Sequence, residues 1–402
     1  MSSYIPKRSP DAKFRTLIVL LDGTGDSVDN DVTNIVRLRD MLPGFDEWNE
    51  NQKVLYVQGI GSKMDDSWQT WTHRMIDQAI AGSFQKFVIK PYEWLVQNYN
   101  DGDKICIFGF SRGAYTARVL AGMINGIGLL PKEGSNHAKE AYDLYDDYAD
   151  LDDKARIDLR PGKFVRLFDM VAPLLGKEKS EQPKFDPGKR KEAWHTLEGQ
   201  WEKFKAKNKC QEVFIEFLGC WHAIALDEHR VKFKQSNWSG PPKEVPDSAD
   251  RPNSKEPKCK TNVEEVWFAG CHCDVGGGSV PNGTRPNLAH ISLRWMIREC
   301  FRTNSSILFK EERIKAIGID PSSIYPITWR EYFYSWVPST SKPEELPIPT
   351  QSEEELDAID ALAPAYDQLT LHSLKWEWME KKKQKKSQPT KDGVWEEVEE
   401  VA

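Results

Sequence analysis

One serine of this chain lies between two glycines, in the stretch Gly109-Phe-Ser-Arg-Gly113. An apolar run over residues 103–110 precedes it, and a helix-like segment over residues 114–124 follows. The pattern G-x-S-x-G between a strand and a helix is typical of a nucleophile elbow, in which the glycines permit a sharp turn that exposes the serine hydroxyl. The spacing predicts Ser111 as the nucleophile of acyl transfer at an ester or amide. The alternative is a structural turn.

A serine nucleophile needs a base within hydrogen-bond reach and an acid that orients the base. His272 follows an apolar segment that is predicted to be a strand, residues 264–271, and precedes a glycine-rich run over residues 276–278. Open α/β sheets place their sites at the carboxyl ends of parallel strands. We therefore expect His272 to be the base, and the alternative is a histidine in a surface turn.

An oxyanion hole needs two backbone N–H groups. The residue after the nucleophile, Arg112, supplies the first in an elbow of this kind. The turn after the first strand is a candidate for the second, through Gly23 or Thr24, because a glycine presents its amide without obstruction. The alternative is a plain turn capped by Asp22.

Composition excludes several classes of function. The 402 residues carry 55 basic and 62 acidic side chains, a net charge of −7 that argues against nucleic-acid binding. No leader or 18-residue apolar run is visible, so we expect a cytoplasmic protein with reduced cysteines. No cofactor or metal is expected: a phosphate-binding loop is missing, and Cys271-His-Cys273 lacks a second pair at zinc spacing. Leu20 stands where a phosphatase with an Asp-Gly-Thr motif needs its aspartate nucleophile.

The periodicity predicts an α/β protein with a mostly parallel sheet and helices on both faces. The strands are expected over residues 14–21, 53–61, 103–110, 211–221 and 264–271, and the longer helices over residues 73–99 and 289–303. We expect a single domain over residues 14–380. It is interrupted by a helical insertion over residues 131–207 and by a polar loop over residues 229–262.

The C-terminal region over residues 321–380 is rich in aromatic side chains, which suits either an acyl pocket or ordinary core packing. Residues 381–402 are expected to form a flexible tail. Its basic run, KKKQKK at 381–386, is either a solvated segment or a peripheral contact with an anionic membrane.

Together, several segments resemble the α/β-hydrolase-like catalytic domain of the type VI secretion phospholipase effectors, a family that also has fungal members. The resemblance covers roughly residues 14–300. It implies a Ser–Asp–His triad that hydrolyses lipid esters, with Ser111 matching the nucleophile and His272 the histidine. The segments are Leu21-Asp-Gly-Thr24, Thr33-Asn-Ile-Val36, Tyr56-Val-Gln-Gly-Ile-Gly61, Gly109-Phe-Ser-Arg-Gly-Ala114, Phe217-Leu-Gly-Cys-Trp221 and Trp267-Phe-Ala-Gly-Cys-His-Cys-Asp-Val-Gly-Gly-Gly278.

The chain departs from the family pattern at the acid, because the matching position is His222. An imidazole supplies no negative charge at neutral pH. Asp227, Glu228 or Asp274 could take the role, although Asp274 also suits a role in holding the glycine-rich turn. The sequence thus favours a serine hydrolase of carboxylic esters, whose substrate is a small molecule or a phospholipid. The alternative is a catalytically impaired relative that acts as a binding or scaffold protein.

Overall fold

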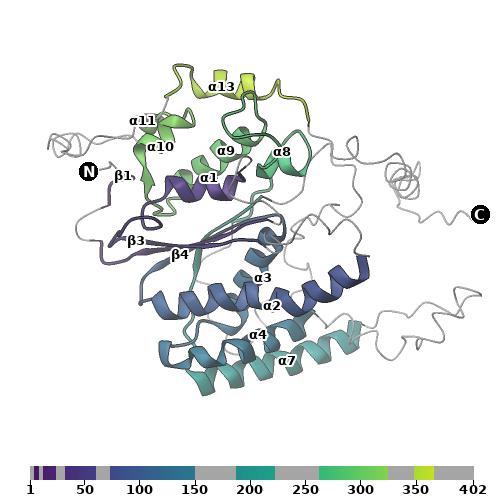
Figure 1. Cartoon of the computed structure of the whole chain (residues 1–402). Helices are drawn as coiled ribbons and strands as arrows, with labels where there is room; N and C mark the ends of the chain where they lie inside the picture. The colour runs from purple at the N-terminus through teal and green to yellow at the C-terminus, as the bar shows by residue number, and fades with distance from the viewer. Residues whose placement is uncertain are drawn as a thin grey trace, which may run out of the picture. The chain divides into compact units, whose positions relative to one another are not determined.

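A computed structural model gives the arrangement of the chain (Figure 1). The structure describes residues 4–8, 12–23, 32–59, 73–149, 187–221, 262–324 and 348–365. The predicted polar loop falls almost entirely outside these ranges. The predicted tail and all aromatic residues of the region 321–380 also lie outside them.

Four strands form a mostly parallel sheet in the order β3-β2-β4-β5. Their bounds are β2 Thr16–Leu21, β3 Gln52–Val57, β4 Lys104–Phe110 and β5 Ile215–Trp221. β2 and β3 pair in parallel from Thr16 opposite Gln52 to Leu21 opposite Val57. All six residues of β2 are buried, as a continuous apolar run predicts for an interior strand. The sheet and its surrounding helices confirm the α/β class.

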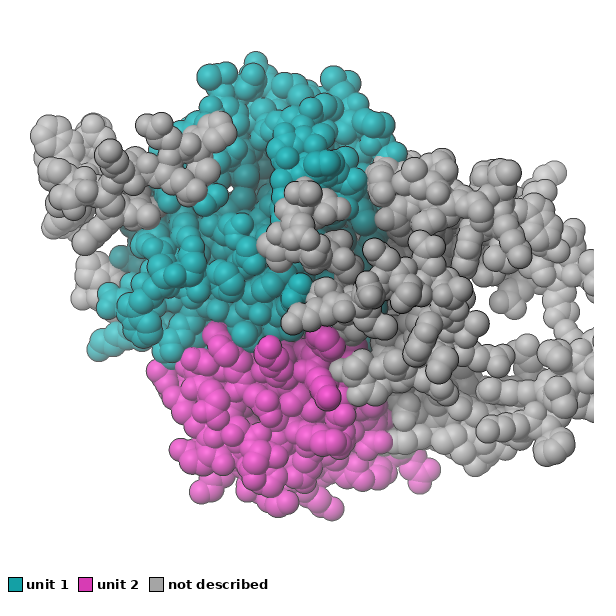
Figure 2. Space-filling model, viewed as in Figure 1, with its two compact units in different colours: residues 1–66, 106–117, 216–402 teal, residues 67–105, 118–215 magenta. Residues whose placement is uncertain are grey.

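The chain divides into two compact units, coloured in Figure 2. Unit 1 comprises residues 1–66, 106–117 and 216–402, and unit 2 comprises residues 67–105 and 118–215. Three of the four boundaries fall inside β4, inside helix α3 (Arg112–Ile127) and at the start of β5, and the fourth, between residues 66 and 67, lies outside the described ranges.

Unit 1 holds the sheet and several helices that pack beside it. Helices α1 and α9 lie on one face of the sheet, and α13 packs against α9 (Figure 1). A short antiparallel pair, β1 with β6, completes the unit's regular structure among the described residues. The bounds are β1 Tyr4–Ile5, α1 Asn34–Met41, α8 His272–Gly276, α9 Ala289–Arg302, β6 Phe309–Lys310, α10 Glu311–Ala316, α11 Pro321–Ile324 and α13 Glu353–Asp360.

Unit 2 is helical in its described part. Besides most of α3 it contains α2 His73–Asn98, η2 Lys132–His137, α4 Ala138–Ala149 and α7 Pro187–Asn208. α4 packs against both α2 and α7. Trp201 links α7 to α4, because its indole N–H donates to the Leu144 carbonyl at 2.9 Å and its ring stacks on Tyr145.

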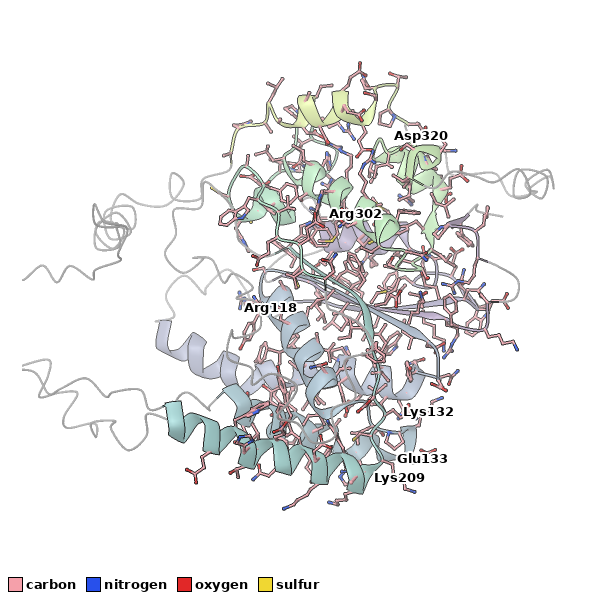
Figure 3. The ribbon with its side chains drawn as sticks, turned by 180° about the vertical axis from the view of Figure 1, so that it is seen from behind. Arg118, Lys132, Glu133, Lys209, Arg302 and Asp320 are labelled. Atoms are coloured by element: carbon pink, nitrogen blue, oxygen red, sulfur yellow. The ribbon has the colours of Figure 1, made fainter. Side chains whose placement is uncertain are left out.

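The strand predicted over residues 264–271 is wrong. Residues 262–267 have no regular structure and are exposed, and Phe268 makes only a single bridge. Glu264 instead forms an ion pair with Arg302. Arg302 is the last residue of α9 and is labelled in Figure 3. The segment lacks the unbroken apolar run of β2 and β4, so its acidic residues remain in solvent instead of entering the sheet.

Candidate active site

Ser111 occupies the turn between β4 and α3. Its φ of +55° lies in the left-handed region, which costs a non-glycine residue on the order of 1–3 kcal/mol. Its backbone is tied on both sides: its amide donates to the Trp221 carbonyl at 3.1 Å, and its carbonyl accepts from the Ala114 amide at 3.0 Å. The strained turn is therefore held by β5 on one side and by the first turn of α3 on the other.

Both glycines of the motif are required by close approach of the backbone. A Cβ atom at Gly113 would lie 2.1 Å from the Leu21 carbonyl oxygen at the end of β2. A Cβ atom at Gly109 would lie 2.3 Å from the Gly113 carbonyl oxygen. Neither distance is possible for a real side chain, so the elbow forms only with glycine at both positions.

His272 lies directly beside Ser111. Its Nε2 atom is 2.8 Å from the Ser111 Oγ atom, and the residue is only 6% exposed. The imidazole stacks on the ring of Phe110, with centroids 4.9 Å apart. Gly276 approaches Phe110 so closely that a Cβ there would lie 1.7 Å from a ring carbon. Phe110 and Gly276 thus set the orientation of the imidazole.

Asp274 caps the short helix that begins with His272. Its Oδ2 atom accepts a hydrogen bond from the Cys271 amide at 2.9 Å, and the residue is buried. This bond satisfies an amide that the helix itself leaves without an acceptor. The described contacts of Asp274 therefore support the structural role that the sequence analysis allowed for it.

The turn after β2 approaches Ser111 closely. A Cβ atom at Gly23 would lie 3.3 Å from the Ser111 Cβ atom. The Gly23 amide, however, donates to the Asp22 carboxylate at 2.7 Å, so this N–H group already has an acceptor. Thr24, the other residue expected in the turn, lies outside the described residues.

Asp22 receives two further hydrogen bonds that the sequence analysis did not anticipate. Thr33 Oγ1 donates to its Oδ1 atom at 2.8 Å, and the Tyr56 hydroxyl donates to its Oδ2 atom at 2.7 Å. Burial raises the pKa of the Asp22 carboxyl above its usual value, and the three hydrogen bonds offset this only in part. The one signal in the sequence was that Thr33 and Tyr56 each begin a segment on which the family resemblance rests.

Residues 15–299 match the family described as "T6SS, Phospholipase effector Tle1-like, catalytic domain". The chain belongs to this family. The match covers well over half of the chain and confirms the resemblance seen in the sequence.

One curated relative of this Tle1-like domain is "Uncharacterized protein YEL023C" of Saccharomyces cerevisiae. It is 34% identical over 141 residues, which make up 33% of this chain. The matched part is only 20% of the yeast protein's own length. No solved structure matches the chain.

In this Tle1-like domain, the residues expected near the acid position fall outside the described ranges. His222, Asp227 and Glu228 all lie in the segment after β5.

Within the described ranges, no three His, Cys, Asp or Glu side chains are grouped so as to hold a metal ion. Nor is any helix of the described part long and apolar enough to cross a bilayer.

Proposed function

We propose that this chain hydrolyses carboxylic esters of lipids, with Ser111 as nucleophile and His272 as general base. The observation that carries the proposal is the 2.8 Å contact between Ser111 Oγ and His272 Nε2 at a strained elbow. A serine and a histidine within hydrogen-bond reach form the activated pair that nucleophilic catalysis needs. Membership of a phospholipase family supports a lipid ester as the substrate.

The reaction follows from this pair. His272 Nε2 accepts the hydroxyl proton as Ser111 Oγ bonds to the ester carbonyl carbon, giving a tetrahedral intermediate with a negative oxygen. When the intermediate collapses, the bond to the leaving alcohol breaks and the imidazolium returns the proton to that alcohol. Water then attacks the acyl-enzyme by the same steps, which releases the carboxylic acid and restores Ser111.

The negative oxygen needs two N–H donors. We assign the first to Arg112, which follows the nucleophile and begins α3. The second comes from the turn after β2, which lies against Ser111. Because the Gly23 amide is bonded to Asp22, the Thr24 amide is the better candidate within that turn.

A third group orients the base, and we place it after β5. Asp274 is engaged in capping α8, whereas Trp221 is bonded through its carbonyl to the Ser111 amide. His222, Asp227 and Glu228 follow Trp221 in the chain. Together with the sheet order, this arrangement supports an α/β-hydrolase-like fold in one domain over residues 14–380.

The test is covalent labelling of the full chain with a fluorophosphonate probe, followed by mass spectrometry of the modified peptide. We expect the wild type to be labelled at Ser111, and Ser111→Ala to lose labelling and at least about 10³-fold of its hydrolysis of p-nitrophenyl butyrate. Ser323→Ala, which removes an exposed serine of α11, is the matched control and should behave as the wild type. A folded wild type that is never labelled would overturn the proposal.

A further inference from the structure

We propose that Asp22 and Thr33 form a positioning pair, which holds the turn beside Ser111 and the helix that carries His272 in one fixed arrangement. The inference rests on the proposed function, because it assigns a role in the same site. Neither residue is assigned to the chemistry itself. Each acts through backbone segments that border the reacting groups.

The first half of the pair fixes the turn. Asp22 directly follows β2, and its Oδ1 atom accepts from both the Gly23 amide at 2.7 Å and Thr33 Oγ1 at 2.8 Å. The Tyr56 hydroxyl holds the other carboxylate oxygen at 2.7 Å. Three donors on two oxygens leave the carboxylate one orientation, and the Gly23 amide is bonded to it. The carboxylate thereby fixes a turn that lies in contact distance of Ser111.

The second half of the pair supports the helix of the base. Thr33 is the N-cap of α1, since its hydroxyl accepts from the Val36 amide at 3.3 Å. Thr33 also pairs in an antiparallel bridge with Gly277, the residue that ends α8 with a φ of +84°. A Cβ atom at Gly277 would lie 2.9 Å from Thr33 Cα. Backbone contact without a gap therefore joins Thr33 to the end of α8.

Asn34 extends this support. Its side-chain amide donates to the Val275 carbonyl in α8 at 3.1 Å and to the Ala289 carbonyl in α9 at 2.9 Å. The residue is fully buried. Because α8 has only five residues, a shift at its supported end moves His272 at the other end. A displacement of about 1 Å at reacting groups can lower a rate on the order of 100-fold.

The energetics of burial indicate that the charge of Asp22 does not serve to stabilise the fold. All three donors to its carboxylate are neutral groups: an amide, a hydroxyl and a phenol. Burying a charge is unfavourable, and burial raises the pKa of Asp22; the three hydrogen bonds and the charge of Arg39 offset this rise only in part. At neutral pH the ionised form therefore opposes folding. A group that is unfavourable for stability and adjoins the reacting serine is what a positioning role predicts.

The test compares Thr33→Val with Thr33→Ser. Valine keeps the shape and loses the hydroxyl, whereas serine keeps the hydroxyl. We expect Thr33→Val to lower kcat for p-nitrophenyl butyrate about 10- to 100-fold with KM unchanged within about twofold, and Thr33→Ser to restore kcat. The rate of phosphonylation should follow kcat.

Ser352→Ala is the matched control for loss of a helix cap. Ser352 caps α13 by accepting from the Glu355 amide at 3.2 Å, and it has no bond to Asp22. Removal of either cap should lower the melting temperature, and Thr33→Val should lower it more because the Thr33 hydroxyl also donates to the buried Asp22. Only Thr33→Val should lower kcat. An equal kcat in Thr33→Val and Ser352→Ala, measured well below both melting temperatures, would overturn the positioning pair.

A second measurement separates this inference from the proposed function. The ¹⁵N spectrum of the His272 imidazole, assigned with His272→Gln, reports its hydrogen bond to Ser111 whether or not the chain is active. If the wild type is not labelled at Ser111, the proposed function fails, and a His272 signal that shifts in Thr33→Val but not in Thr33→Ser still supports the pair. If the wild type is labelled and neither rate nor signal changes in Thr33→Val, the pair fails and the hydrolase stands.

Discussion

Asp22 and Asp360 are two of the buried carboxylates of unit 1, and their surroundings differ in charge. Asp22, beside Ser111, accepts only from neutral donors. Asp360, the last residue of α13, accepts from the Arg294 guanidinium at 2.8 Å and lies 3.6 Å from His290. Burial would raise the pKa of both. Hydrogen bonds from Arg294 and the Asn287 amide, together with the nearby His290, reverse this for Asp360 and lower its pKa to about 2.

The two buried charges have opposite effects on the stability of the fold. At Asp360 the charge is matched by the Arg294 guanidinium, so its ionised form favours folding and fastens α13 to α9. At Asp22 the ionised form opposes folding, yet it orders the turn and the helix around the Ser–His pair. The buried charge of Asp360 therefore stabilises the fold, whereas the buried charge of Asp22 lowers its stability and orders the surroundings of Ser111.

We expect the largest loss of stability from a substitution that disrupts the contacts of α13. Arg294→Leu leaves Asp360 and Asp357 without their shared cation, and Arg294 itself is fully buried. We expect a loss of about 3–5 kcal/mol in the free energy of unfolding, measured by urea denaturation at neutral pH. Lys315→Met, which removes a partly exposed ion pair with Glu311 in α10, is the control and should cost about 0–1 kcal/mol. Equal losses would show that burial does not distinguish the two pairs.

The next prediction compares alanine substitutions at two glycines, one beside Phe110 and one beside α13. Gly276→Ala would displace the Phe110 ring on which His272 stacks, whereas Gly318→Ala would displace Leu356 of α13. Both changes should lower the melting temperature, and Gly318 adds strain because its φ is +90°. Only Gly276→Ala should lower kcat for p-nitrophenyl butyrate, by about 100-fold. A similar loss of kcat in Gly318→Ala would contradict the separation of the two regions.

The smallest expected effects are changes in the free energy of unfolding with pH. The native pKa of Asp360 is lowered, so its stabilisation is present above the usual aspartate value and is lost as the pH falls towards 2. Asp360→Asn should therefore cost about 2 kcal/mol at neutral pH, and this difference should narrow below about pH 4.

Asp22 should show the opposite sign. Because its native pKa is raised, ionisation destabilises the fold above that pKa, and the wild type gains stability as the pH falls through it. Asp22→Asn should thus be at least as stable as the wild type at neutral pH, and its advantage should shrink on acidification. Urea denaturation of both aspartate variants between pH 3 and 7 checks the two signs. A large loss of stability in Asp22→Asn at neutral pH would mean that its charge serves the fold.

By itself the sequence determined the features that short segments specify. The apolar runs of β2, β4 and β5 specified strands, and the glycines around Ser111 indicated a sharp turn, because glycine adopts backbone conformations that a Cβ would obstruct. The ordered motifs specified the family. The sequence also proposed His272 as the partner of Ser111, although 161 residues separate them.

Tertiary structure alone decided the rest. The segment before His272 was predicted to be a strand, but a strand needs a neighbouring backbone, and residues 262–267 are exposed without one. Thr33 and Tyr56 meet Asp22 across 11 and 34 residues of chain, and Arg294 meets Asp360 across 66. Whether a buried carboxylate faces a hydroxyl or a guanidinium depends on which elements pack together, so the opposite roles of the two aspartates could not be read from local pattern.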